Sequence, residues 1–525
     1  MSYLIVECAG RTNLAAFRSS AGLASALAVA AALVLLPAPS ARAAGDGFLS
    51  AEFVHDTVTR NEAFDDLTHL ISRDSLAANI LHLQSYGTRY AYSPQVVKAG
   101  RWLMARLAGF GYTDTLYQSV IVGDGKVQIA QANVAATKLG TTRPEYRIII
   151  GSHYDCITYN QPVPPSVSAP GADDNASGTS AVLEIARVLR DVELDATVQF
   201  VSFTGHEVGM LGSYEFAAAL AEEGVPPEKL FFLNLDMIGN AEGRGPWRVK
   251  IHDDLPSRPL AWLASRIGVA YTPLEPLMAG VRTADQTNFH DQGYRAIFLH
   301  EGDFNLPNYH SITDLLENLE MEYLEQVVEM AMAIVLHLAT LAEPPGDVTA
   351  AQTGTGEVLV EWSHSLDADV VGYHVEVLDG AGEVVQKVFT RGDSALVDAS
   401  ALDAGARVRV RAEDVLGEGE ASAAVLVGTG ERLTVCATPN PSAGPCRFDV
   451  FVPGTGAPVH GIVKMVDAAG RFIAAVHDAP LERGSNLLRW SGLLPDGRPA
   501  PNGIYFYMVK TDAVGSARGR IMLAR

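Results

Sequence analysis

Five side chains of the types that bind metal ions stand in short motifs along the chain. Three of these motifs directly follow apolar, strand-like runs at 147–150, 198–203 and 231–235. Open α/β sheets collect ligands at the carboxyl ends of their parallel strands, so side chains placed there converge. Imidazole and carboxylate are groups that bind zinc. The spacing therefore predicts a divalent-metal site built from His153 (in GSHYD), Asp174 (in GADDNASG), Glu207 (in TGHEVG), Asp236 (in NLDMIG) and His310 (in NYHSITD).

Asp155 is placed to support this predicted site. It follows His153 by two positions, so both side chains point the same way on an extended chain. A carboxylate there can hold the second N–H of a metal-binding imidazole. The other common zinc motif, H-E-x-x-H, does not occur here, because position 210 is methionine.

The metal motifs fall within residues 44–343, which alternate helical and strand-like periods. Apolar positions recur at helical spacing over 61–83 and 95–110, and an amphipathic run at 321–342 closes the segment. This alternation predicts an α/β domain with a mixed, mostly parallel sheet flanked by helices. Asp174 is expected near the N-terminus of a helix, where a carboxylate is favoured.

Two all-β domains are predicted to follow. Consecutive prolines at 344 and 345 cannot continue a helix, so they end the α/β domain. Residues 344–430 alternate apolar and polar positions in EVLVEW, GYHVEVLD and ARVRVRAED, between Gly-rich turns. With Trp362 and Tyr373 at these places, the segment resembles a fibronectin type III module. A generic β-sandwich is the alternative, and neither supplies catalytic groups.

The last segment, residues 431–525, resembles the Ig-like domain of flagellar hook-capping proteins and the related C-terminal sorting domains of exported bacterial enzymes. Trp490, Gly503 and Tyr505 occur in the expected order. The resemblance implies a partner in the secretion machinery or at the cell surface. A passive spacer domain is the alternative.

The first 43 residues predict an export signal. Arg11 and Arg18 precede an apolar stretch at 21–36, and Ala41-Arg42-Ala43 is a cleavage signal of the A-x-A type. The apolar stretch is shorter than the ~20 residues of a membrane-spanning helix, which disfavours a permanent anchor. We therefore expect cleavage after Ala43, no integral membrane segment afterwards, and a secreted or cell-surface protein of bacterial-type export.

Charge and cysteine content give weaker indications. The formal net charge of −22 argues against binding to nucleic acid or to an anionic membrane, since both require a basic surface. Cys436 and Cys446 flank a turn-rich stretch and could form a disulfide. Two unpaired thiols are the alternative.

The stretch from about 130 to 340 resembles the exported di-zinc aminopeptidases of metallopeptidase family twenty-eight. The resemblance rests on NVAATK, GSHYD, APGADDNASG, GHEVGMLGS, NLDMIG, ADQTNF and NYHSITD, which occur in the family's order. It implies a zinc-exopeptidase fold, two zinc ions, and peptide or protein substrates with a free N-terminus. By position it implies that Asp174 bridges the ions, His153 and Asp236 bind one, Glu207 and His310 bind the other, Asp155 orients His153, Asp285 helps to shape the site, and Tyr309 steadies the tetrahedral intermediate.

His206 is where the chain departs from this family. Its members carry a glutamate, the general base, immediately before the ligand that corresponds to Glu207. An imidazole can accept a proton near neutral pH, and a nearby zinc ion favours its neutral form. We therefore expect an aminopeptidase in which His206 serves as the base; the alternatives for His206 are that it binds metal or orients the substrate. A glutaminyl-cyclase-like acyl transferase and a non-catalytic metal-binding surface protein are the alternatives.

Overall fold

The computed structural model describes residues 58–524 apart from 124–127, 242–245, 303–306, 353–356, 399–405, 428–432, 439, 441, 454–456 and 495. The predicted export signal, residues 1–43, lies outside the described residues. Among the described helices, none is long and apolar enough to span a membrane.

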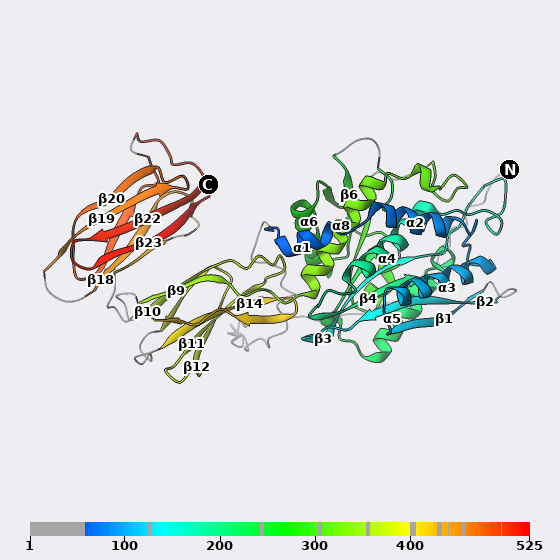
Figure 1. The fold of residues 1–525 in the computed structure, drawn as a ribbon, viewed down its shortest axis with the longest axis horizontal. Coiled ribbons are helices and arrows are strands. Elements are labelled where there is room, and N and C mark those ends of the chain that lie inside the picture. The colour runs from blue at the N-terminus through cyan, green and yellow to red at the C-terminus, as the bar shows by residue number, and fades with distance from the viewer. Residues whose placement is uncertain are drawn as a thin grey trace, which may run out of the picture. The chain divides into compact units, whose positions relative to one another are not determined.

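An eight-stranded mixed sheet with the order β1-β2-β4-β3-β5-β8-β6-β7 forms the centre of the α/β part (Figure 1). Strands β4, β3, β5 and β8 lie side by side and run parallel. β5 and β8 are buried along their whole length, as parallel strands covered on both faces must be. The strands are β1 (Thr115–Gly123), β2 (Gln128–Lys138), β3 (Arg143–His153), β4 (Ala196–Phe203), β5 (Leu230–Leu235), β6 (Arg248–His252), β7 (Glu275–Met278) and β8 (Arg295–Glu301).

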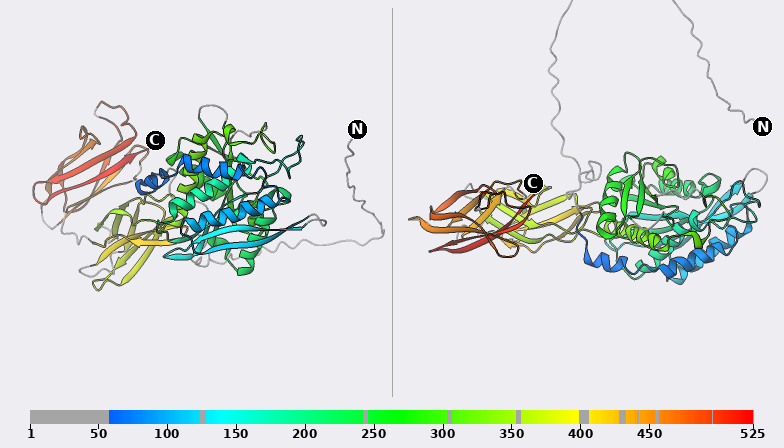
Figure 2. Two further views of the ribbon diagram at one scale, coloured as in Figure 1. Left: turned by 45° about the vertical axis from the view of Figure 1, so that its right-hand side comes forward. Right: turned by 90° about the horizontal axis from the view of Figure 1, so that it is seen from above.

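Helices cover both faces of this sheet (Figure 2), which confirms the predicted α/β class. Successive residues of a strand point to opposite faces. Ile148 and Ile150 of β3 thus pack with α2, α3, α4, α6 and α8, whereas Ile149 packs with α5 and α7. The helices are α1 (Glu62–Thr68), α2 (Arg73–Gln84), α3 (Pro94–Gly109), α4 (Gly178–Leu189), α5 (Leu211–Glu223), α6 (Arg258–Tyr271), α7 (Gln286–Asp291) and α8 (Met321–Ala339).

Residues 61–83, whose periodicity predicts helical structure, form two separate helices, α1 and α2. Ser72 has extended backbone angles, and its hydroxyl accepts a hydrogen bond from the N–H of Ser75, so α2 begins afresh there. Glu184 of α4 strengthens this cap, since its carboxylate accepts the N–H of Ser72 at 2.8 Å.

The chain beyond α8 forms antiparallel sheets. The first group comprises a β13-β10-β9 sheet and a β12-β11-β14-β15 sheet, with β16 paired to β14. Alternate residues of β10 are buried, and the ring of Trp362 lies 5.4 Å from that of Tyr373 in their shared core. The strands are β9 (Gly346–Gln352), β10 (Glu357–Ser363), β11 (Gly372–Leu378), β12 (Val384–Thr390), β13 (Ser394–Asp398), β14 (Arg407–Asp414), β15 (Gly417–Ala421) and β16 (Val425–Leu426).

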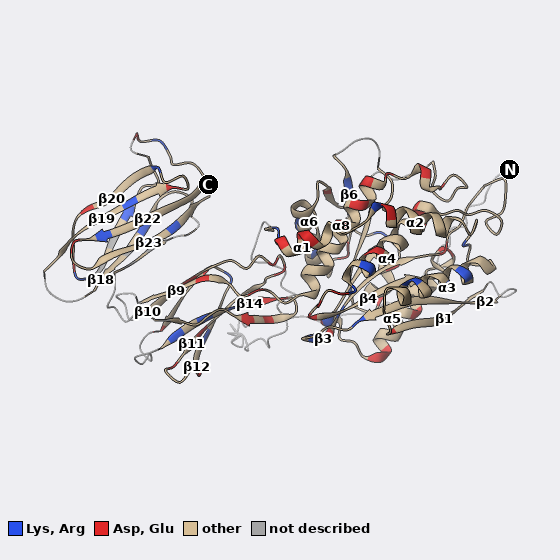
Figure 3. Ribbon diagram, viewed as in Figure 1, with Lys and Arg blue, Asp and Glu red and all other residues tan. Residues whose placement is uncertain are grey.

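A second group of antiparallel strands has its own core. It comprises a β17-β18-β21 sheet and a β20-β19-β22-β23 sheet. Cys446 is buried there as a free thiol, while the side chain of Cys436 is not among those described. Acidic and basic residues are interspersed along the described elements (Figure 3). The strands are β17 (Thr434–Thr438), β18 (Cys446–Val452), β19 (Val459–Asp467), β20 (Phe472–Leu481), β21 (Gly484–Trp490), β22 (Gly503–Thr511) and β23 (Gly515–Leu523).

Candidate metal centre

The ends of the parallel strands bring the predicted ligands to one edge of the sheet. His153 is the last residue of β3, and Asp236 directly follows β5. Glu207 lies just after β4 in the short helix η3 (His206–Val208). Asp174 comes instead from η2 (Ala172–Ser177), which leads directly into the N-terminus of α4. His310 lies in the loop between β8 and α8.

Two glycines allow the turn that presents Glu207. Gly205 and Gly209 flank η3 with φ angles of 68° and 119°, which residues with a side chain rarely adopt. His310 itself has a φ of 51°, in the same left-handed region. Strain of this kind in a residue other than glycine is concentrated at functional sites.

The five predicted ligands form two groups that share Asp174. Nε2 of His153 lies 3.3 Å from Oδ1 of Asp174 and 3.3 Å from Oδ1 of Asp236. Nε2 of His310 lies 3.0 Å from Oδ2 of Asp174 and 3.2 Å from Oε2 of Glu207. The two oxygens of Asp174 thus face two different imidazoles.

These distances fit zinc. Two donor atoms held about 2.1 Å from one tetrahedral zinc ion lie about 3.4 Å apart. The four nitrogen–oxygen separations of the two groups, 3.0–3.3 Å, are close to that value. Oε1 of Glu207 is buried without a hydrogen-bond partner among the described residues, so it is an acceptor that a metal ion could engage.

The charges of the cluster also favour a cation. Burial and the charge of Asp174 raise the pKa of Glu207 to about 7. Burial opposes ionisation of Asp174 as well, yet His153 and His310 lower its pKa well below the usual value. Burial lowers the pKa of His310, but contacts with Asp174 and Glu207 outweigh it and raise the value to about 10. Protons therefore neutralise the metal-free cluster, and a divalent cation would replace them.

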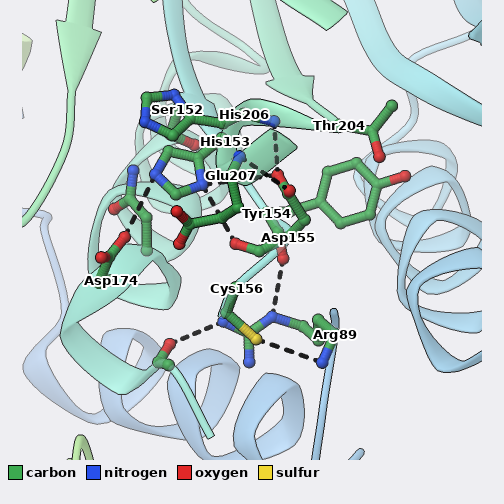
Figure 4. A network of polar contacts seen from close by, with 12 residues as sticks. Arg89, Ser152, His153, Tyr154, Asp155, Cys156, Asp174, Thr204, His206 and Glu207 are labelled. Carbon is green, nitrogen blue, oxygen red and sulfur yellow. Dashed lines mark hydrogen bonds and ion pairs between the residues drawn. The ribbon is translucent and has the colours of Figure 1, made fainter. Parts of the chain in front are cut away.

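Asp155 connects the two groups of ligands (Figure 4). Its Oδ1 accepts the N–H of His206 at 3.1 Å, and its Oδ2 accepts the N–H of Glu207 at 3.2 Å. Nδ1 of His153 lies 3.1 Å from the main-chain oxygen of Asp155 and 3.6 Å from its carboxylate. The nearer acceptor for the Nδ1–H is thus the main-chain carbonyl, because the turn at η3 engages the carboxylate. Either contact engages Nδ1, so Nε2 is the nitrogen of His153 that faces the other ligands and would face a metal ion.

His206 lies directly against the predicted ligand His153. Its ring stacks on that of His153, with centroids 3.9 Å apart and planes 9° apart. Nδ1 of His206 lies 3.0 Å from Oδ2 of Asp285, whose Oδ1 accepts the hydroxyl of Ser213 at 2.5 Å. Burial and His153 lower the pKa of His206, but Asp285 outweighs both and raises it to about 9.

Tyr309 lies beside the second group. Its ring stacks on that of His310 with centroids 3.8 Å apart. Burial, followed by the charges of Asp174 and Glu207, raises the pKa of the Tyr309 hydroxyl well above its usual value. The hydroxyl therefore keeps its proton near neutral pH and can donate a hydrogen bond.

The sequence analysis missed two residues that hold the Asp174 loop. The carboxylate of Asp314 accepts the N–H groups of Asp173 at 2.8 Å and Asp174 at 3.1 Å. The buried guanidinium of Arg89 donates to the main-chain oxygens of Tyr154 at 2.8 Å and Gly171 at 2.7 Å (Figure 4). Asp314 lies within the quoted motif NYHSITD, four residues after His310, which was its only signal in the sequence.

Comparison with known proteins finds relatives among peptidases. Residues 133–335 match the model of Peptidase family M28. A probable aminopeptidase of Saccharomyces cerevisiae is 27% identical over 295 residues, which cover 54% of this chain and 77% of that protein. A probable leucine aminopeptidase of Trichophyton verrucosum is 29% identical over 290 residues, which cover 52% and 73%. Among solved structures, LapB from Legionella pneumophila has a TM-score of 0.47 at 22% identity and covers 56% of this chain and 79% of that chain. These findings indicate that the chain is a metallo-exopeptidase, whose residues 133–335 are similar to Peptidase family M28.

Proposed function

We propose that the chain is a secreted aminopeptidase that uses two zinc ions to remove N-terminal residues from peptides. The observation that carries the proposal is the position of Asp174, whose oxygens lie 3.3 Å from His153 and 3.0 Å from His310. A carboxylate that faces two imidazoles in this way suits a pair of ions better than a single ion. The descriptions of the relatives as aminopeptidases support the substrate class.

In this proposal each ion has its own ligands besides Asp174. His153 and Asp236 complete one site, and Glu207 and His310 complete the other. Bound zinc would supply Lewis acidity at the peptide carbonyl and lower the pKa of a bound water toward about 7. The other steps belong to side chains of the protein.

His206 is the general base of the proposed mechanism. Asp285 accepts its Nδ1–H, which leaves Nε2 as the proton acceptor, and Ser213 holds Asp285 in place. Nε2 takes a proton from the attacking water and passes it to the leaving amine. With a pKa of about 9 in the metal-free chain, the ring is protonated at neutral pH. A divalent cation beside it favours the neutral form, so the base is competent only in the loaded centre.

Tyr309 completes the proposed mechanism. Its ring stacks on that of His310 and its hydroxyl stays protonated, so in this proposal the hydroxyl donates a hydrogen bond to the oxygen on which negative charge develops. Donors aimed at that oxygen stabilise the transition state more than the ground state.

One observation favours a second function, a metal-binding protein without turnover. His206, His153 and Asp236 offer ligand atoms that all lie within 4.8 Å of one another. If His206 bound an ion through Nε2, no base would be left at its position. Measurement of turnover distinguishes the two functions.

The proposal extends to the rest of the chain. Residues 1–43 would be the export signal and 44–343 the peptidase domain. Residues 344–430 would be a fibronectin type III-like domain, and 431–525 an Ig-like domain for sorting or attachment. α8 ends at Ala339 and β9 begins at Gly346, which supports a boundary at the prolines between them.

The experiment compares amino-acid release from aminoacyl amides by the zinc-loaded chain and its His206→Ala and His206→Glu variants. His69→Ala, which replaces an exposed histidine, is the control. We expect His206→Ala to keep both ions and to lose about 10²–10⁴-fold in rate, whereas His206→Glu keeps measurable turnover. Equal rates for the parent chain and His206→Ala would refute His206 as the base. Activity in His206→Glu alone would identify the natural chain as a metal-binding relative without catalysis.

A further inference from the structure

A second cluster of buried carboxylates lies outside the metal centre, in the first group of β-strands. Asp367 and Asp369 lie in the loop between β10 and β11, and Asp414 is the last residue of β14. Their side chains are almost wholly inaccessible, with exposed fractions of 1%, 0% and 4%. Carboxylates are rarely buried so completely unless a partner compensates their charge.

Two of these carboxylates are held by hydrogen-bond donors. Asp414 accepts the N–H groups of Leu416 at 2.7 Å, Gly417 at 3.1 Å and Ala342 at 2.5 Å. Asp367 accepts the N–H of Glu343 at 2.7 Å and the hydroxyl of Ser365 at 3.0 Å. The cluster thus connects the segment just after α8 to two loops of the β-strands.

Asp369 is different, because both of its carboxylate oxygens are buried without a hydrogen-bond partner among the described residues. The N–H groups of its own residue and of Val415 face the carboxylate, but without hydrogen-bond geometry. Its strongest charge interactions are with Asp414 and Asp367, which repel it. Burial and this repulsion raise the pKa of Asp369 well above its usual value.

The imidazole of His337, which lies close to Asp367, does not compensate this charge. Nδ1 of His337 lies 3.9 Å from Oδ1 of Asp367. However, the same nitrogen accepts the N–H of Ala368 at 3.2 Å, so it carries no proton. Burial also lowers the pKa of His337 to about 3, which keeps the ring neutral. With His337 neutral, the repulsion between the carboxylates is left for a proton or a metal ion to relieve.

We infer that Asp369 and Asp414 bind a calcium ion, with Asp367 beside them and main-chain oxygens or water completing the coordination. The side-chain donors are all carboxylate oxygens, which suit calcium or magnesium better than zinc. Calcium accepts irregular shells of protein oxygens, whereas magnesium requires nearly ideal octahedral geometry. Because Asp414 also accepts the N–H of Ala342, the ion would stabilise the entry of the chain into the β-strands.

The test is calcium uptake by the full-length chain with its zinc centre saturated. Equilibrium dialysis against radioactive calcium at about 1 mM covers the affinities usual for extracellular modules. We expect the parent chain to take up one calcium ion more than Asp369→Asn. The control Glu383→Gln removes an exposed carboxylate from the same group of strands and should bind as the parent does. Equal uptake by the parent and Asp369→Asn, or no uptake by the parent, would overturn the inference.

Thermal unfolding provides a second readout that does not depend on how well the variant folds. Calcium should raise the melting temperature of the parent chain and of Glu383→Gln, and magnesium at the same concentration should raise it less. If protons neutralise the cluster instead, calcium will leave the melting temperature of the parent unchanged. That result would also overturn the inference, whatever the behaviour of Asp369→Asn.

Discussion

Replacement of Asp155 by asparagine should weaken zinc binding although Asp155 is not a proposed ligand. Its carboxylate accepts the N–H groups of His206 at 3.1 Å and Glu207 at 3.2 Å. An asparagine has one acceptor oxygen, so one of these N–H groups would face the amide NH₂ in a buried site. The loss of a hydrogen bond to a charged acceptor costs about 1.5–3 kcal/mol. Because the turn at η3 carries Glu207, we expect zinc affinity to fall by about 10–100-fold.

Competition against a chromophoric zinc chelator measures this change, with circular dichroism as a check on folding. The matched control is Asp195→Asn, since Asp195 accepts the N–H of Leu341 at 2.8 Å and is not part of the metal centre. The control should lower the melting temperature and leave zinc affinity unchanged. If Asp155→Asn binds zinc as tightly as the parent while folded, the argument that the carboxylate positions the ligands is wrong.

Three further predictions concern the same centre. Asp174→Ala should lose both ions, because its two oxygens face both groups of ligands, and normal zinc content by mass spectrometry would contradict this. Zinc uptake should release protons, because the pKa of His310 is about 10 and that of Glu207 about 7 in the metal-free chain. Zinc affinity should therefore rise at least about tenfold from pH 6 to pH 7, one factor of ten for each proton displaced. Titration calorimetry measures this affinity, and a value that does not change with pH would contradict the prediction. A chain limited to residues 44–343 should keep its zinc and its activity on small amides, but it should melt at a lower temperature, because Leu416 packs into the main core. A folded, zinc-loaded truncation without activity would contradict the domain assignment.

The sheet and the position of His153 and Asp236 at its edge could be predicted from the sequence. The reason is local: apolar runs specify buried parallel strands, and the residue after such a strand lies at a shared edge. The placement of Asp174 before α4 followed from the small residues that precede an apolar-striped helix.

The contacts that hold the ligands in place could not be predicted in this way. Asp314 acts on residues 140 and 141 positions away, and Arg89 on a carbonyl 82 positions away. His206 and Asp285 are 79 positions apart. Such pairs are brought together by the fold as a whole, and no periodicity of the sequence records them. The buried state of Asp369 was equally hidden, because its neighbours in the sequence are typical of a surface loop.

The central claim is that Asp174 bridges two zinc ions between His153 and His310. Anomalous X-ray diffraction from crystals of the zinc-loaded chain tests it most directly. The account predicts two zinc peaks about 3.5–4 Å apart, one beside each imidazole, with one oxygen of Asp174 bound to each. A single zinc peak at full loading, or two peaks that do not share Asp174, would contradict it.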